Sequence, residues 1–256
     1  MTIIYITVIK DGCWRIRMSE EFQDRAKQYR EMGKTAFIIG YTGECGKELV
    51  KALSKNRIFN KVVLIGRRNV DLTPDPGPEF EQKVIDYDKL EEYTEAFQGA
   101  QVGYCCLGTT RGKAGKEGFI KVDRDYVLKS AEIAKSTGCQ HFSVVTASSA
   151  NKDSMFLYVK TKGEVEHSLK QMAFDKLSIF KPAMLLCERS ERRIMEKVAL
   201  TLMKPWICMF PTAGSVPTSY VGTAMVVDTV TPSEGNLRIY NNEQIHSVFK
   251  QNEQKK

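Results

Sequence analysis

The residues Thr35-Ala36-Phe37-Ile38-Ile39-Gly40-Tyr41-Thr42-Gly43-Glu44-Cys45-Gly46 carry the strongest structural signal in the chain. An apolar run typical of a buried strand leads into glycines with the spacing G-x-x-G-x-x-G, and a helical pattern follows from Glu44 to Asn56. A pyrophosphate needs exposed N–H groups at a helix N-terminus and close approach of the main chain, which glycine permits. The motif predicts a dinucleotide-binding turn, with Tyr41 directed away from the phosphates. The alternative is a tight turn whose glycines serve packing alone.

Apolar runs and helical patterns alternate along the following residues. Five further strands are predicted, at 61–65, 83–85, 102–107, 142–146 and 177–181. Three further helices are predicted, at 88–97 with Asp88 as its cap, at 123–136 and at 155–172. A charged, glycine-rich loop is expected at 108–118.

This order of elements is typical of βαβ units that enclose a buried parallel sheet. We predict an α/β fold, a doubly wound parallel sheet of the NAD(P)-binding Rossmann type, as a single domain over residues 19–256. A helix at 19–32 precedes the first strand, and a small C-terminal elaboration begins at about residue 183 with a basic helix near 188–203. Residues 1–18 are expected to form an appendage to this domain.

The second predicted strand ends in Gly66-Arg67-Arg68. An NAD site usually carries an acidic residue about 20 residues beyond the glycines, where it binds the ribose 2′-hydroxyl. Two guanidinium groups at that place suit a 2′-phosphate instead, so NADP(H) is the predicted cofactor, with a solvated basic loop as the alternative. Asp86 is placed to contact the adenine. Leu107 and Gly108, after the fourth strand, are placed to pass close to the nicotinamide ribose.

Tyr158 and Lys162 lie one helical turn apart, on the same face of a predicted helix. The lysine charge and an oxidised nicotinamide would both favour the phenolate, so this tyrosine can act as a general acid/base in carbonyl reduction or alcohol oxidation. A third group should polarise the substrate oxygen from the end of the fifth strand. Thr146 and Ser148 are the candidates there, and the alternative for each is that it only caps the strand.

Composition is that of an ordinary globular protein of 256 residues with a formal net charge of +7. The 38 basic and 31 acidic residues are spread along the chain, so nucleic acid is not an expected partner. The apolar run at 3–9 is far shorter than the ~20 residues of a membrane span, and no signal peptide is predicted. A cytoplasmic location is therefore the default expectation.

The seven cysteines include no C-x-x-C pair, which argues against a disulfide framework or a zinc site and for a reducing compartment. The three histidines are scattered, so no metal is expected. Cys105 and Cys106 lie next to each other at the end of a predicted interior strand. Such cysteines are more often inert core residues than redox sensors, because reactivity needs exposure and an ionised thiol.

The run Cys105-Cys106-Leu107-Gly108-Thr109-Thr110-Arg111-Gly112-Lys113-Ala114-Gly115 resembles the short-chain dehydrogenase/reductase superfamily, in its atypical single-domain branch. With Leu64–Arg68, Val122–Ala131, Phe156–Tyr158 and Lys162–Glu166, it is similar to the Tat-interacting oxidoreductase-like proteins of that branch. The resemblance covers roughly residues 20–250. The chain departs from the family pattern in three places. It has Thr146-Ala147 where relatives carry a serine pair. Residues 189–215 match the family poorly, and residues 1–18 have no counterpart in it.

The resemblance implies an NADPH site lined by Thr42, Gly43, Glu44, Cys45, Arg67, Arg68, Leu107, Gly108, Tyr158, Lys162, Leu185 and Arg193. It implies a cytoplasmic protein, associated in some members with the nuclear envelope, that is a monomer or a redox-dependent homodimer. Two functions stay open. One is an NADP(H)-dependent oxidoreductase for a small, unidentified carbonyl or alcohol. The other is an NADPH-binding, redox-sensing regulator that acts through nuclear import receptors or a translation elongation factor with little or no turnover.

Overall fold

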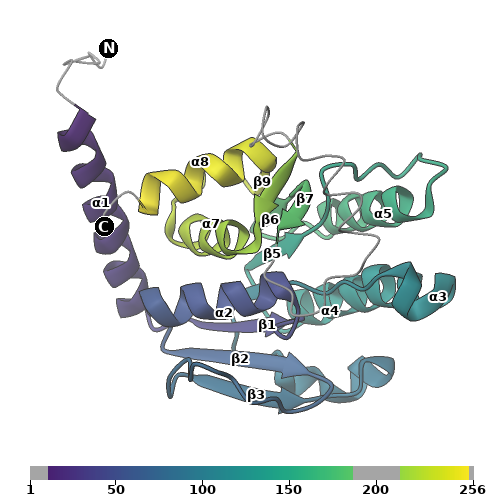
Figure 1. Cartoon of the computed structure of the whole chain (residues 1–256). Helices are drawn as coiled ribbons and strands as arrows, with labels where there is room; N and C mark the ends of the chain where they lie inside the picture. The colour runs from purple at the N-terminus through teal and green to yellow at the C-terminus, as the bar shows by residue number, and fades with distance from the viewer. Residues whose placement is uncertain (1–10, 187–213, 254–256) are drawn as a thin grey trace.

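The computed structural model describes residues 11–186 and 214–253, and at its centre these form a parallel sheet of seven strands (Figure 1). In spatial order the strands are β3 (Phe80–Val84), β2 (Lys61–Gly66), β1 (Thr35–Ile39), β4 (Val102–Cys105), β5 (His141–Val145), β6 (Lys176–Phe180) and β9 (Leu237–Tyr240). The chain moves outward from β1 to β3 and then crosses back to β4, so the strand order reverses between β1 and β4. The predicted doubly wound fold is confirmed.

Helices cover both faces of the sheet and divide its side chains between two cores (Figure 1). One face carries α1 (Asp11–Glu31), α2 (Glu44–Asn56), α7 (Thr218–Val230) and α8 (Asn242–Glu253), and the other carries α4 (Tyr126–Ser136) and α5 (Leu157–Gln171). In β1, Ile38 packs into the first core while Phe37 and Ile39 pack into the second. Because both faces are buried, the strands read as continuous apolar runs rather than as alternating patterns.

The predicted loop 108–118 is instead mostly helical. Helix α3 spans Arg111–Ile120, is interrupted at Gly115 (φ 70°), and continues through the π-helical turn η2 (Lys121–Asp125) into α4. The glycines of α3 lower its intrinsic helix propensity, which is why the pattern favoured a loop. The Thr110 carbonyl nevertheless closes a first turn by accepting the N–H groups of Lys113 and Ala114.

The predicted helix 88–97 is a 3₁₀-helix, η1 (Tyr87–Ala96), and its predicted cap is wrong. Asp86 rather than Asp88 caps it, because the Asp86 carboxylate accepts the N–H of Asp88 at 2.9 Å. Helix α1 spans Asp11–Glu31, so it begins earlier than the helix predicted at 19–32 and includes residues 11–18 of the expected appendage. No helix within residues 11–186 and 214–253 is both long enough and apolar enough to cross a membrane.

The C-terminal residues add a second small sheet and also complete the main one. Strand β7 (Met184–Leu186) pairs in parallel with β8 (Ser215–Pro217), whereas β9 extends the main sheet beside β6. Helix α7 packs closely on α2, since a Cβ on Gly222 would lie 2.7 Å from the backbone of Glu48 and Leu49. The basic helix expected near 188–203, with Arg193, lies outside the described residues.

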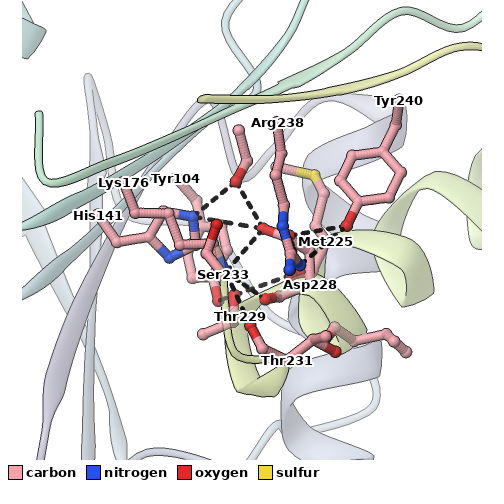
Figure 2. A network of polar contacts seen from close by, with 12 residues as sticks. Tyr104, His141, Lys176, Met225, Asp228, Thr229, Thr231, Ser233, Arg238 and Tyr240 are labelled. Atoms are coloured by element: carbon pink, nitrogen blue, oxygen red, sulfur yellow. Dashed lines mark hydrogen bonds and ion pairs between the residues drawn. The ribbon is translucent and has the colours of Figure 1, made fainter. Parts of the chain in front are cut away.

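A buried polar network holds the end of α7 against the sheet (Figure 2). The Asp228 carboxylate accepts hydrogen bonds from Ser178 at 2.6 Å, from Tyr240 at 2.8 Å and from Arg238 at 3.1 Å. It also lies 3.4 Å from both Lys176 and His141. Burial alone would raise the pKa of Asp228, but its hydrogen bonds and the neighbouring cations outweigh burial and hold that pKa below its ordinary value.

Candidate functional site

The glycine turn joins β1 to α2 at the point where the strand order reverses. Gly40 has φ +78°, and a Cβ there would lie 2.5 Å from the carbonyl carbon of Cys106, so the turn packs directly on the chain that leaves β4. A Cβ on Gly46 would overlap the Gly40 carbonyl oxygen. Gly43 is the N-cap of α2, and no side chain caps the first turn of this helix. Gly40 and Gly46 are therefore required by packing, while the helix N-terminus at Gly43 stays open to an anion.

Tyr41 is directed into the protein, as expected. Its side chain is buried against Gly66, and its hydroxyl lies 2.7 Å from Gln82 Oε1 and 3.2 Å from the carbonyl oxygen of Arg68. Burial raises the pKa of this phenol. The tyrosine thus connects the glycine turn to the end of β2 and fixes the main chain that carries Arg68.

A groove of about 720 Å³ opens between the glycine turn and the ends of β2 and β4. Its wall carries Arg67 and Arg68, which are both exposed and form no ion pair with another residue in the described part of the chain. Tyr87 and Tyr126 form an aromatic side of the groove, with ring centroids 5.2 Å apart. This part offers cations beside a flat apolar surface, which suits a phosphorylated nucleoside.

A second groove, of about 550 Å³, continues from the glycine turn toward α5. Both grooves are lined by Thr42, Gly43, Cys106, Leu107, Gly108, Thr109 and Lys113. The second groove also contains Thr146, Tyr158, Lys162 and Leu185. The two grooves therefore meet at the open N-terminus of α2 and form one path along the carboxyl ends of the strands.

Tyr158 and Lys162 come together on α5 in very different surroundings. The tyrosine is about half exposed, and its ring lies 5.9 Å from that of Phe119. Lys162 is buried, and its Nζ lies 2.8 Å from Asp123 Oδ1. The pair thus combines an accessible hydroxyl with a fixed buried ammonium, one turn apart on the same helix.

The two candidates for the third group are placed differently. Thr146 is buried in the second groove, and its hydroxyl donates to Glu166 Oε1 at 2.7 Å. Glu166 in turn pairs with Lys181 at 2.8 Å. Ser148 is exposed, does not line the groove, and its main-chain N–H donates to the Pro182 carbonyl. Of the two residues, only Thr146 lies in the groove, and its hydroxyl hydrogen is already donated to Glu166.

Most of the sequence-predicted site residues converge on this path. They are Gly40, Thr42, Gly43, Glu44, Cys45, Arg67, Arg68, Leu107, Gly108, Thr146, Tyr158, Lys162 and Leu185. Gly46 packs behind the turn, and Asp86 is exposed with its carboxylate on the cap of η1, so its contact with an adenine stays a prediction. Arg193 lies outside the described residues.

Sequence reasoning missed Lys113, Asp123, Tyr87 and Tyr126. Lys113 lies in a segment predicted to be a loop, and the sequence pattern marks Asp123 only as the start of a helix. Spacing gave no sign that a residue 39 positions before Lys162 would contact it. Lys113 and Asp123 both lie in stretches that carry the family resemblance, so the resemblance was the available signal for these two residues.

The adjacent cysteines differ in position: Cys105 is fully buried behind the groove, whereas Cys106 is partly buried and lines it. Burial raises the pKa of the Cys105 thiol to about 12, and it also raises the pKa of Cys106 well above the ordinary value. Cys45, Cys105, Cys106 and Cys139 are all free thiols. Because the thiolate is the reactive form, Cys105 and Cys106 have the character of core residues in this conformation.

A glycine turn at the strand-order reversal, and a groove along the carboxyl edge of a doubly wound sheet, define an NAD(P)-binding protein with an oxidoreductase-like fold. A family model described as NAD(P)H-binding matches residues 40–201. The rat protein HTATIP2 is 43% identical over 219 residues, which cover 86% of this chain and 90% of the relative. The chain belongs to this NAD(P)H-binding family and, within it, to the family of HTATIP2.

Solved structures share the fold at low sequence identity. A putative NAD-dependent epimerase/dehydratase from Bacillus halodurans superposes with a TM-score of 0.63 at 17% identity, covering 86% of this chain and all of its own. MoeE5 in complex with UDP-glucuronic acid and NAD has a TM-score of 0.61 at 14% identity, over 81% of this chain and 75% of its own. These similarities support the fold and do not distinguish NADP from NAD.

The expected cytoplasmic location, with association to the nuclear envelope, requires correction. FMP52-2 of Scheffersomyces stipitis is 32% identical over 73% of this chain and 82% of its own length, and it is named a mitochondrial protein. Relatives from Debaryomyces hansenii and Candida albicans, each 32% identical, carry the same designation. Cysteine usage argues for a reducing compartment but does not distinguish one reducing compartment from another, so it gave no basis for choosing the cytoplasm.

Proposed function

We propose that this protein is an NADP(H)-dependent oxidoreductase that acts on a small carbonyl or alcohol, with Tyr158 as its general acid/base. The observation that carries the proposal is that Tyr158 and Lys162 line the same groove as the open N-terminus of α2. A dinucleotide bound along that groove would have its pyrophosphate at the helix N-terminus and its nicotinamide beside Tyr158. The bound cofactor supplies or accepts the hydride.

The residues of this chain manage the proton and the geometry. In the reducing direction the Tyr158 hydroxyl donates its proton to the carbonyl oxygen as the carbonyl carbon gains the hydride, and in the oxidising direction the phenolate takes that proton back. Lys162, fixed beside Asp123, would hydrogen-bond the nicotinamide ribose and would favour the phenolate through its positive charge. Leu107 and Gly108 line the same groove and would lie against that ribose.

Thr146 has a different role from the one expected of a third catalytic group, which was to polarise the substrate oxygen. Its hydrogen is donated to Glu166, so its oxygen is left to accept rather than to donate. A threonine held in this way can orient a substrate alcohol by accepting its hydrogen bond, but it does not polarise a carbonyl. Tyr158 is then the residue that donates to the substrate oxygen.

The preference for NADP(H) rests on Arg67 and Arg68. Both guanidiniums are exposed at the groove beyond β2, and hydrogen bonding of Tyr41 to the Arg68 carbonyl fixes their main chain. A 2′-phosphate there would gain charge-assisted hydrogen bonds that a 2′-hydroxyl cannot make.

The test is NADPH oxidation by the purified protein across a panel of small aldehydes and ketones. We expect turnover by the wild type that falls at least about a hundredfold in Tyr158→Phe, since general acid catalysis contributes at least that much. The control is Tyr93→Phe, which removes a phenol outside the groove. NADPH binding without turnover, or equal turnover in Tyr158→Phe, would contradict the proposal.

A second function, a regulator that binds NADPH and acts through protein partners, is favoured by one observation. Met155 and Phe156, directly before α5, are 99% and 77% exposed beside the accessible Tyr158. Contiguous exposed apolar patches mark interaction sites, and these two side chains adjoin each other in the chain. Partner capture that requires NADPH, together with absence of turnover, would support this second function. Oligomeric state and the nature of the partners stay predictions.

A further inference from the structure

Asp123 is a buried carboxylate in an unusual turn. The π-helical turn η2 joins α3 to α4, and Asp123 lies at its centre with 1% of its surface exposed. The neighbouring Arg124 and Asp125 pair with each other nearer the surface. A π turn is wider than an α-helical turn and is frequent at functional sites. A carboxylate this deeply buried requires compensating partners.

Both oxygens of Asp123 have such partners, and both partners line the groove. Oδ1 lies 2.8 Å from Lys162 Nζ, and Oδ2 accepts the main-chain N–H of Thr109 at 2.7 Å. A Cβ on Gly108 would lie 3.5 Å from Oδ1, so the loop after β4 passes close over the carboxylate. One side chain therefore connects α5 with the 107–109 loop.

A purely structural ion pair is the alternative explanation. Buried ion pairs often stabilise a fold no better than apolar residues of similar volume would, so stability alone does not account for this pair. The position of the pair does account for it, because Lys162 and the 107–109 loop line the part of the groove where the proposed function puts the nicotinamide ribose. We propose that Asp123 is a positioning residue for the dinucleotide, acting through Lys162 and the Thr109 amide. This inference rests on the proposed function and adds to it.

The test is Asp123→Asn, with Asp125→Asn as its matched control. Asparagine keeps the size and can still accept the Thr109 N–H, but it cannot balance the Lys162 charge. The control makes the same change two residues away, on an exposed side chain of the same turn. By NADPH fluorescence titration we expect Asp123→Asn to weaken binding about tenfold, equivalent to about 1.4 kcal/mol, and Asp125→Asn to bind like the wild type.

Two further measurements separate positioning from simple loss of structure. At saturating protein, the emission enhancement of bound NADPH reports how firmly the nicotinamide is held, and we expect a smaller enhancement in Asp123→Asn even with every cofactor bound. In a Lys162→Met background, Asp123→Asn should cause less additional loss of affinity than in the wild type, because residues that act together are not additive. The double variant leaves no buried ion unpaired, so where Asp123→Asn fails to fold we expect the double variant to fold and to bind NADPH as Lys162→Met does, and a clearly weaker affinity than that of Lys162→Met would overturn the inference.

NADPH affinity of Asp123→Asn equal to the wild type would overturn this inference, whatever the turnover. Full additivity in the double variant would overturn it as well. Binding does not depend on hydride transfer, so a protein that binds NADPH in an Asp123-dependent way but reduces no carbonyl would overturn the proposed function alone. A wild-type protein that does not bind NADPH would overturn both.

Discussion

Replacing Asp228 by asparagine should strongly destabilise the fold. Its carboxylate accepts hydrogen bonds from Ser178, Tyr240 and Arg238 and lies beside Lys176 (Figure 2). An amide carries no charge, and it places an N–H₂ group where the carboxylate accepted donors, so Lys176 and Arg238 lose their buried counter-charge. Removing one partner of a buried ion pair costs about 3–5 kcal/mol. For a chain of this size that corresponds to a fall in Tm of about 10 °C.

The measurement is unfolding by urea and by heat, followed by far-UV circular dichroism. The control is Asp175→Asn, at the same end of the sheet but with a side chain 70% exposed, which should change stability by less than about 0.5 kcal/mol. Equal stability of Asp228→Asn and the wild type would refute the reasoning, because the network would then contribute nothing beyond what an amide provides.

The same network predicts how stability depends on pH. The pKa of Asp228 is lowered in the folded state, so its contribution is present above the unfolded value of about 3.9 and is lost as pH falls below it. Burial also lowers the pKa of His141, so protonation favours the unfolded state once pH falls below about 6.5. Wild-type stability should therefore decline from about pH 6.5 downward and more steeply below about pH 4. In Asp228→Asn the lower step should be reduced.

Three shorter predictions concern the groove. Replacing Arg67 and Arg68 by alanine should lower the preference for NADPH over NADH at least about tenfold, since each lost charge-assisted bond is worth about 1.5–3 kcal/mol; competitive titration measures it. Lys113→Ala should weaken NADPH binding severalfold and flatten its salt dependence, because this lysine lines both grooves; titration at two salt concentrations checks this. Gly40→Ala should abolish NADPH binding and lower Tm. The φ of +78° disfavours a side chain, and a Cβ at this position would lie 2.5 Å from the carbonyl carbon of Cys106. Calorimetry checks this, and an unchanged Tm would contradict it.

Periodicity and glycine spacing were enough to predict six of the seven strands of the main sheet, and β9 was not predicted. Apolar runs identified strands β1, β2, β4, β5 and β6 to within one or two residues, because each is buried on both faces. The edge strand β3 was placed three residues late, since half-exposed residues such as Glu81 and Lys83 dilute its apolar pattern. Helix α3 was missed because its glycines favour a loop when only local propensity is considered.

The residues of the candidate site also fall into two groups, those that the sequence predicts and those that only the fold reveals. Gly43, Tyr158 and Lys162 are recognisable because their spacing is local, within one turn or one helix. Asp123 and Glu166 act over distances in sequence that no local pattern encodes, and each became visible only when the fold brought it to Lys162 and Thr146 respectively. Both are buried carboxylates, which composition counts as ordinary surface charge.

The Asp228 network and the Asp123–Lys162 pair lie at opposite ends of the sheet, so we expect the first to affect stability and the second to affect cofactor binding. His141 and Lys176 are the first residues of β5 and β6, so the Asp228 network lies at the amino ends of these strands. Thr146 follows the last residue of β5 and lies in the groove at the opposite ends. A five-residue strand spans about 16 Å, so no hydrogen bond or ion pair can join the two systems directly. Asp228→Asn should therefore lower Tm and leave the NADPH affinity of the folded protein unchanged, whereas Asp123→Asn should change affinity. A shared effect would mean that β5 and β6 transmit strain between the two ends of the sheet.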